Sequence, residues 1–216
     1  FALDSYRRLI QMYANVVLGV EHERFEAVIA NKKRMDNVES DADFNVDQLN
    51  WIINAYKNTV ERFTDAAFPQ EPYEQLTGAI EAVFNSWQNK RAVTYRKINN
   101  IPDAWGTGAT VQTMVFGNLN DKSGTGVAFT RNPSNGDKEL YGEYLINAQG
   151  EDVVAGIRTP HPIKKNKKVE QESLESKFPK AYKEILEIST KLENHFKEVQ
   201  DIEFTIENED IYLLQT

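Results

Sequence analysis

The run Asp201-Ile-Glu-Phe-Thr-Ile206 alternates polar and apolar residues near the end of the chain. After the polar turn Glu207-Asn-Glu-Asp210, a second short run follows, Ile211-Tyr-Leu-Leu-Gln215. Alternation with a period of two on either side of a short polar loop is typical of a β-hairpin. The sequence therefore predicts two antiparallel strands at this end of the fold.

The two predicted strands carry side chains with oxygen ligands. Strict alternation gives each strand one face of three residues, which are Asp201, Glu203 and Thr205 in the first and Ile211, Leu213 and Gln215 in the second. We expect the hairpin to bring two carboxylates and the Gln215 amide close together, beside an apolar core. Such ligands suit Mg²⁺, which usually takes one or two protein carboxylates and leaves its other positions to phosphates and waters. On the pattern alone, an ordinary solvent-exposed strand face is an open alternative.

The composition is that of a globular protein and excludes several function classes. The 216 residues are 40% hydrophobic and 27% charged, and they can form one large domain or two small ones. The net charge of −8 argues against a general binder of nucleic acids or acidic membranes, which needs a basic surface. The absence of cysteine excludes disulfides, thiolate catalysis and cysteine-ligated zinc. The hydrophobic and charged content leads us to expect a soluble globular protein. No apolar run approaches the roughly 18 residues of a membrane span.

The first part of the chain has helical periodicity. Apolar residues recur at helical spacing in four segments, which are 6–17, 25–29, 49–63 and 76–87, the last extending towards Asn99. Asp4 or Ser5 suits the start of the first helix, and Asn45 or Asp47 that of the third. Pro72 suits the first turn of the fourth helix, where its missing N–H costs nothing. The sequence therefore predicts a small, all-helical first unit.

The character of the chain changes near Ile101. Residues that favour β-structure predict strands at 109–116, 127–130 and 140–146, in addition to the hairpin. Apolar periodicity predicts a long helix over 174–199. We therefore expect an α+β fold, in which a helical subdomain precedes an antiparallel sheet backed by the long helix, with the boundary between Pro72 and Ile101.

Two glycine-containing patterns have both a functional and a structural interpretation. Glu151 and Asp152 follow Gly150 at a strand exit, where ligand-contacting residues concentrate, but acids at a helix N-terminus are equally consistent. Ser123-Gly-Thr-Gly126 resembles a phosphate cradle, but turn chemistry explains it better, so a hairpin turn is expected there.

The basic and imidazole side chains give weaker signals. His22, His161 and His195 have no partner at metal-ligand spacing, and we assign them no catalysis. The lysine-rich run 164–168 is expected to be a solvated loop. The pair Arg7-Arg8 suits phosphate, but a solvent-facing helix position is the preferred interpretation.

Several stretches together carry a resemblance to a known family. They are Phe1-Ala-Leu-Asp-Ser-Tyr-Arg-Arg-Leu-Ile-Gln-Met12, Ala79-Ile-Glu-Ala-Val-Phe84, Ala92-Val-Thr-Tyr-Arg96, Val111-Gln-Thr-Met-Val-Phe-Gly117, Gly124-Thr-Gly-Val-Ala-Phe-Thr-Arg131, Tyr141-Gly-Glu-Tyr-Leu-Ile-Asn-Ala-Gln-Gly-Glu-Asp-Val-Val-Ala-Gly-Ile-Arg-Thr-Pro160, Asp201-Ile-Glu-Phe-Thr-Ile206 and Leu214-Gln-Thr216. On these stretches the chain resembles the pyruvate phosphate dikinase family, in its N-terminal nucleotide-binding region of ATP-grasp type. The match spans the whole chain and is weakest at 36–48 and 161–175.

The resemblance implies a domain organisation and a reaction. It implies a helical subdomain at 1–77, a connecting helix and strand of the nucleotide-binding core at 78–123, and a C-terminal ATP-grasp subdomain at 124–216. In the family, ATP, inorganic phosphate and pyruvate interconvert with AMP, pyrophosphate and phosphoenolpyruvate. A catalytic histidine on a separate domain accepts the β,γ-phosphates of ATP. With the abrupt ends at Phe1 and Thr216, the resemblance implies an excised piece of this larger enzyme.

The resemblance also implies roles for particular residues. By similarity, Glu203 and Gln215 hold Mg²⁺ and ATP as the catalytic and metal-binding residues, with Asp201 beside them. The implied nucleotide-binding residues are Gln112, Glu143, Glu151, Asp152 and Arg7. Carboxylates that hold Mg²⁺ fit phosphoryl transfer, which needs alignment and charge neutralisation more than covalent help from the protein.

The resemblance further implies partners and leaves alternatives. The partners are ATP or AMP and the phosphohistidine domain of the same full-length chain, without nucleic acid or membrane. The full enzyme is expected to be a homodimer in the cytoplasm, or in a plastid or glycosome if the parent carries a targeting signal. Phosphoenolpyruvate synthase and rifampin phosphotransferase carry the same Glu/Gln hairpin and are alternatives. A non-catalytic nucleotide-binding or docking module is another alternative. Because the other domains are missing from this sequence, we expect the chain alone to be inactive.

Overall fold

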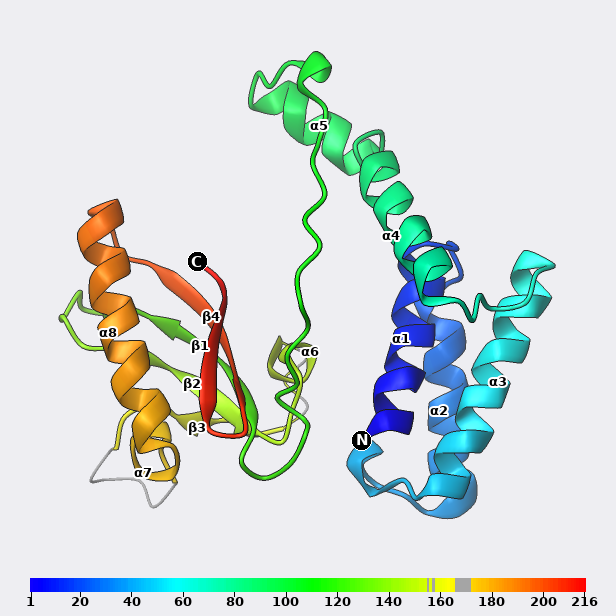
Figure 1. Cartoon of the computed structure of the whole chain (residues 1–216), viewed down its shortest axis with the longest axis horizontal. Helices are drawn as coiled ribbons and strands as arrows, with labels where there is room; N and C mark the ends of the chain where they lie inside the picture. The colour runs from blue at the N-terminus through cyan, green and yellow to red at the C-terminus, as the bar shows by residue number, and fades with distance from the viewer. Residues whose placement is uncertain (155, 157, 166–171) are drawn as a thin grey trace. The chain divides into compact units, whose positions relative to one another are not determined.

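The computed structural model of the chain describes residues 1–154, 156, 158–165 and 172–216. These residues divide into two units, Phe1–Val111 and Gln112–Thr216. The first unit is built from helices, and the second carries a five-stranded sheet with a long helix, which confirms the predicted α+β class (Figure 1). The finer division at 77 and 123 stays a prediction, and the lysine-rich run 164–168 lies partly outside the described residues. No helix of the described ranges has the length and apolar character needed to cross a bilayer.

Three helices of the first unit form a small bundle. They are α1 (Ala2–Val16), α2 (His22–Asp36) and α3 (Val46–Thr64). Their apolar stripes meet in a core whose fully buried members are Ile10, Ala14, Phe25, Ile52, Tyr56 and Val60. Asn45 starts α3 with a capping box, because its side chain accepts from the Gln48 N–H and the Gln48 side chain accepts from the Asn45 N–H, both at 2.9 Å. The expected start of α1 at Asp4 or Ser5 is wrong, since that helix already begins at Ala2.

The predicted fourth helix is interrupted. Helix α4 (Pro72–Ser86) has Pro72 in its first turn, as predicted, but it ends well before Asn99. A separate helix, α5 (Lys90–Ile98), begins after a turn at 87–89. Short 3₁₀ turns complete the unit at Asp41–Asp43 and Asp103–Trp105.

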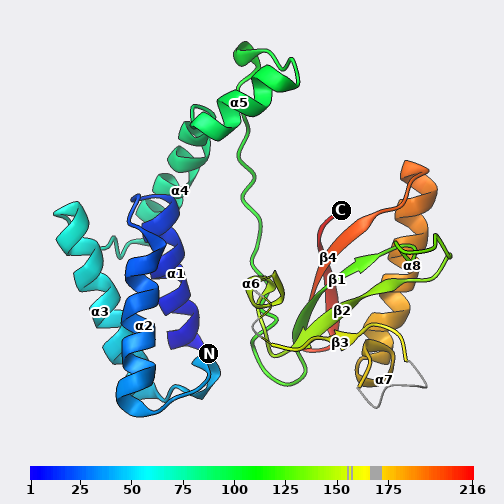
Figure 2. The same ribbon diagram turned by 180° about the vertical axis from the view of Figure 1, so that it is seen from behind.

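The second unit is an antiparallel sheet backed on one face by a helix (Figure 2). Its strands are β1 (Gly124–Phe129), β2 (Tyr141–Ile146), β3 (His161–Pro162), β4 (Asp201–Glu207) and β5 (Asp210–Gln215), in the spatial order β3-β2-β1-β4-β5. The long helix is α8 (Pro179–Phe196), and the short helices are α6 (Gly150–Val154) and α7 (Leu174–Lys177). The predicted helix over 174–199 is therefore two helices, because the backbone of Phe178 leaves the helical region before Pro179, with φ −127° and ψ 65°.

Strand β4 alternates between the core and the opposite face. Ile202, Phe204 and Ile206 are fully buried and pack with Ala181 and Ile185 of α8. Asp201 and Glu203 point the other way and are exposed. Burying an aliphatic or aromatic side chain contributes about 1.5–3 kcal/mol. The apolar half of β4 therefore holds the strand against α8 and leaves its acidic half on the open face.

The hairpin turn expected at Ser123–Gly126 is wrong. Gly124 and Gly126 lie inside β1, where neighbouring groups approach closely. A Cβ at Gly126 would lie 2.6 Å from the Phe204 ring and 2.6 Å from the Glu143 carbonyl oxygen. Glycine is required here because it leaves room for Phe204 in the core.

The strand expected at 109–116 is also not formed. This segment has no regular secondary structure, and the side chains of Val111 and Met114 are exposed by 65% and 61%. β-forming residues need a neighbouring strand to satisfy their backbone groups, and this segment pairs with none among the described residues. Its end is anchored, since the Phe116 N–H donates to a Glu207 carboxylate oxygen at 2.6 Å.

A buried ion pair lies along α1. Arg7 is only 3% exposed, and its Nη2 lies 2.7 Å from Asp4 Oδ1 and 3.6 Å from Asp41 Oδ2. Arg8 Nε lies 3.1 Å from the other Asp4 oxygen. The expectation that Arg7 faces solvent is therefore wrong, because Asp4 compensates its charge inside the bundle.

We predict that Asp4→Asn lowers the free energy of unfolding of the first unit by about 3 kcal/mol at neutral pH, because it leaves the buried Arg7 charge poorly compensated. All three tryptophans, Trp51, Trp87 and Trp105, belong to this unit, so their fluorescence in urea reports its unfolding. Glu61→Gln, the same chemical change at an exposed position of α3, is the control and should leave stability within about 0.5 kcal/mol.

The effect of Asp4→Asn should also depend on pH. Burial raises the pKa of the Asp4 carboxyl, but the charges and hydrogen bonds of Arg7 and Arg8 outweigh it, so the pKa lies below its usual 3.8. The stabilisation is therefore complete above the ordinary pKa and is lost as pH falls through the lowered pKa. Unfolding of both proteins from pH 6 downward should show the difference shrinking below about pH 4. A difference that stays constant to pH 2 would contradict this assignment.

Candidate functional site

Glu203 and Gln215 face each other across the C-terminal hairpin. They occupy opposite positions in the adjacent strands β4 and β5. Opposite residues of an antiparallel pair share a face of the sheet, with Cβ atoms about 5 Å apart. The structure thus brings together the two side chains that the hairpin pattern predicted to meet.

The face on which Gln215 lies depends on a β-bulge. Phe204 is opposite Leu213, whereas Glu203 is opposite Gln215, so Leu214 is an extra residue in β5. An extra residue shifts the alternation of the residues beyond it to the other face. The expectation that Leu213 and Gln215 share a face is therefore wrong. Leu213 lies on the side of the core residue Phe204, and Gln215 lies on the side of Glu203.

The same row of the sheet extends to a second acid. Val127 of β1 is opposite Glu203 on one side and Glu143 of β2 on the other. Two strand spacings place the backbones of Glu143 and Glu203 about 10 Å apart. Asp201, opposite Phe129, lies on the same face and about 7 Å along β4 from Glu203. Three exposed carboxylates and one amide therefore occupy the sheet face that α8 leaves open.

Helix α6 borders this open face. It contacts β1 and β2. The buried Thr125 hydroxyl below it donates to the Phe204 carbonyl oxygen at 3.2 Å. Glu151 and Asp152 lie in the first turn of α6, and Asp152 Oδ2 accepts from the Gln149 N–H at 2.9 Å. The two acids thus lie at a helix N-terminus, as the structural interpretation of the pattern predicted. Their contact with a nucleotide stays a prediction.

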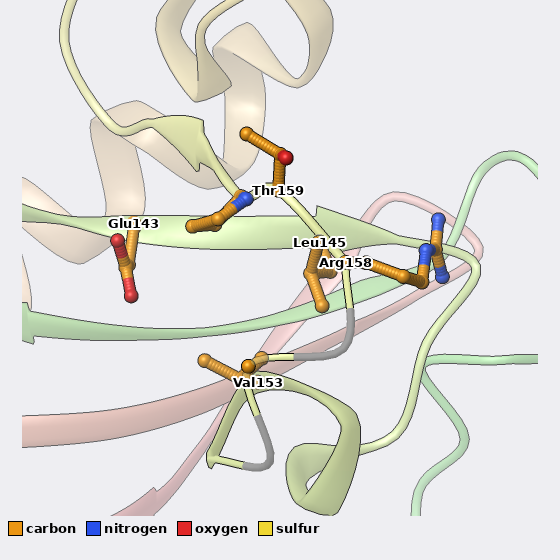
Figure 3. Close-up of a pocket in the computed structure, with 7 residues that line it drawn as sticks. Glu143, Leu145, Val153, Arg158 and Thr159 are labelled. Atoms are coloured by element: carbon orange, nitrogen blue, oxygen red, sulfur yellow. The ribbon is translucent and has the colours of Figure 1, made fainter.

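A pocket of about 310 Å³ opens between β2 and the segment that follows α6 (Figure 3). Its lining residues are Glu143, Leu145, Val153, Gly156, Arg158, Thr159 and Pro160. Leu145 lies between Glu143 and Arg158, and Val153 of α6 faces them (Figure 3). The sequence pattern did not single out Arg158, because a lone arginine in a loop has neither periodicity nor ligand spacing.

The other two predicted nucleotide-binding residues have different surroundings. Gln112 is exposed, in the segment where no strand forms. Arg7 is buried in the helical bundle with Asp4, as described above. The roles of these two residues in nucleotide binding stay predictions.

The oxygen ligands on the open face suit Mg²⁺, because they are too few to surround a metal ion completely. Within the described ranges, no group of three His, Cys, Asp or Glu side chains could hold a metal ion. A carboxylate and an amide oxygen in cross-strand register suit an ion that keeps several positions for phosphates and waters. Glu203 and Gln215 can thus supply part of a Mg²⁺ shell that a substrate completes.

Comparison with known proteins identifies the family. The family model described as "Pyruvate phosphate dikinase, AMP/ATP-binding domain" matches residues 31–183. The protein named "Pyruvate, phosphate dikinase" of Rhizobium meliloti (strain 1021) is 52% identical over 220 residues, covering 100% of this chain and 24% of that protein. The protein of the same name from Clostridium symbiosum is 52% identical over 217 residues, with the same coverage. "Pyruvate, phosphate dikinase 1, chloroplastic" of Arabidopsis thaliana is 46% identical over 215 residues, covering 100% of this chain and 22% of that protein.

These matches cover the chain but only part of its relatives. The chain spans about a quarter of the length of the curated proteins that it matches. On the family match and on identities near 50%, the chain belongs to the pyruvate phosphate dikinase family, as a fragment that includes part of its AMP/ATP-binding domain.

Proposed function

We propose that this chain holds Mg²⁺ and ATP for phosphoryl transfer within a larger dikinase. The observation that carries the proposal is the register of β4 and β5, which sets Glu203 opposite Gln215 on an open face. Family membership supports a nucleotide as the ligand of this domain. The names of the relatives support a dikinase that uses pyruvate and phosphate. For the full enzyme we propose the reaction in which ATP, phosphate and pyruvate give AMP, diphosphate and phosphoenolpyruvate.

The residues of the open face would act by positioning the substrate. Side-chain oxygens of Glu203 and Gln215 hold the metal ion, and Asp201 lies beside them on the same face. When bound, Mg²⁺ supplies charge neutralisation at the phosphate oxygens. Phosphoryl transfer needs in-line alignment, and a rigid antiparallel sheet fixes the relative positions of these side chains.

The exposure of these side chains suits transfer to another domain. Glu143, Asp201, Glu203 and Gln215 are all exposed in this chain. An acceptor histidine on a separate domain must reach the β-phosphate of ATP directly, so the site has to be open on one side. We include Gln112, Glu143, Glu151 and Asp152 as nucleotide-binding residues. For Arg7, nucleotide binding competes with its buried ion pair to Asp4.

The finer partner and localisation assignments come from the family. We propose that the phosphohistidine domain of the full-length chain is the partner and that the full enzyme is a homodimer. A cytoplasmic location, or a plastid one as for relatives named chloroplastic, accompanies this proposal. Because the chain spans about a quarter of its relatives, we expect the chain alone not to form AMP from ATP.

We predict that Glu203→Gln and Gln215→Ala, each made in the full-length enzyme, slow AMP formation from ATP about 100-fold or more, because metal-assisted charge stabilisation contributes several kcal/mol. Exchange between pyruvate and phosphoenolpyruvate should be unchanged, since that half-reaction uses another domain. Glu187→Gln, on the exposed side of α8 behind the sheet, is the matched control. Unchanged AMP formation in both variants would leave only the docking-module alternative.

We predict that the Mg²⁺ dependence of AMP formation also changes in Glu203→Gln. In Glu203→Gln, the Mg²⁺ concentration that gives half-maximal AMP formation should rise about tenfold or more, because one of few protein ligands loses its charge. Titration of Mg²⁺ at fixed ATP measures this shift. If the Mg²⁺ midpoint is unchanged in Glu203→Gln, as it should be in Glu187→Gln, then Glu203 does not hold the metal ion.

A further inference from the structure

The pocket beside β2 has opposite charges at its two ends. Glu143 lies at one end of the lining and Arg158 at the other, with Leu145 between them (Figure 3). The Arg158 side chain is hydrogen-bonded to the Ile146 carbonyl oxygen. Ile146 is three residues from Glu143 in β2, which corresponds to about 10 Å along the strand. The pocket therefore offers a cationic donor at a fixed distance from an acidic residue of the proposed site.

The Arg158 guanidinium is oriented although the residue is exposed. Its Nη2 donates to the Ile146 carbonyl oxygen at 2.8 Å, and its Nη1 donates to the Asn147 carbonyl oxygen at 3.1 Å. These are two of the five N–H donors of the side chain. The acceptors are neutral main-chain groups, and among the described residues no carboxylate forms an ion pair with Arg158. The positive charge is thus held in place without being neutralised by a described side chain.

The surroundings of Arg158 favour an anion with several acceptor oxygens. Thr159 lines the same pocket and carries a hydroxyl, and Leu145, Val153 and Pro160 supply apolar walls. Arginine binds phosphate through parallel N–H donors, and a pre-oriented fork loses less entropy on binding. The carboxylate of Glu143 excludes an anion from the opposite end and favours a cation or a hydroxyl group there.

We propose that Arg158 and Thr159 form a phosphate-binding subsite of this pocket, at the margin of the acidic face. This inference rests on the proposed function and names a group that binds the phosphate of its substrates. Two sources have the same chemistry, a phosphate group of ATP and free inorganic phosphate. Both present tetrahedral phosphoryl oxygens to the guanidinium, so the experiment has to separate them.

Arg158→Gln in the full-length enzyme tests the subsite. The Michaelis constant for either ATP or inorganic phosphate should rise about tenfold, because a charge-assisted hydrogen bond is lost, while kcat changes less than about twofold. Arg158→Lys should restore part of the affinity, since it keeps the charge but not the fork. Thr159→Val should raise the same constant about threefold. Lys164→Gln removes a charge from the same segment outside the pocket lining and is the control.

Calorimetric binding provides a second readout that does not require turnover. Titration of ATP and of inorganic phosphate into the wild-type enzyme, Arg158→Gln and Lys164→Gln gives each dissociation constant separately. A weaker constant for ATP assigns the subsite to the nucleotide, and one for inorganic phosphate assigns it to the free ion. Unchanged constants for both ligands, or an equal loss in Lys164→Gln, overturn the proposal. If Glu203→Gln retains AMP formation, the proposed metal site is rejected. The dissociation constants of Arg158→Gln still test the phosphate subsite in that case.

Discussion

The fit of Phe204 against Gly126 sets the register on which the candidate site depends. Phe204 is fully buried opposite Gly126, and any larger residue at 126 would collide with its ring. This pairing fixes β1 on β4, which places Val127 opposite Glu203. The pairing of β1 with β2 places Glu143 on the other side of Val127. A slip of one residue would turn every side chain of β4 to the other face. The core packing of one residue thus determines where the acids point.

The two faces of the sheet divide structural and chemical work. The face towards α8 carries the apolar side chains that stabilise the unit, and the open face carries exposed carboxylates and an amide. Acids alone repel a phosphate chain, so the open face needs a metal ion and a cationic group to bind ATP. The cross-strand pair of Glu203 and Gln215 suits the metal ion, and Arg158 at the margin of the face is the cationic group.

The sequence predicted the elements more reliably than their details. Helical and alternating periodicity identified the bundle and the C-terminal hairpin, because these features are local, but Gln215 reaches the face of Glu203 only through the bulge in β5. The bulge at Leu214 has no sequence pattern of its own, since its cause is the pairing with β4. The role of Gly126 depends on a distant partner, Phe204, and the burial of Arg7 depends on the packing of the bundle around its ion pair with Asp4. The segment 109–116 has strand-forming residues but pairs with no described strand, and propensity cannot supply one.

The claim that Glu203 and Gln215 act together on one metal ion is tested most directly by a double-mutant cycle. Binding of Mg²⁺–ATP to the full-length enzyme is measured for the wild type, Glu203→Gln, Gln215→Ala and the double variant. If both side chains hold the same ion, the two losses should be non-additive, with a coupling of about 1 kcal/mol or more. Losses that add within about 0.3 kcal/mol would show that the two residues act independently and would contradict the account.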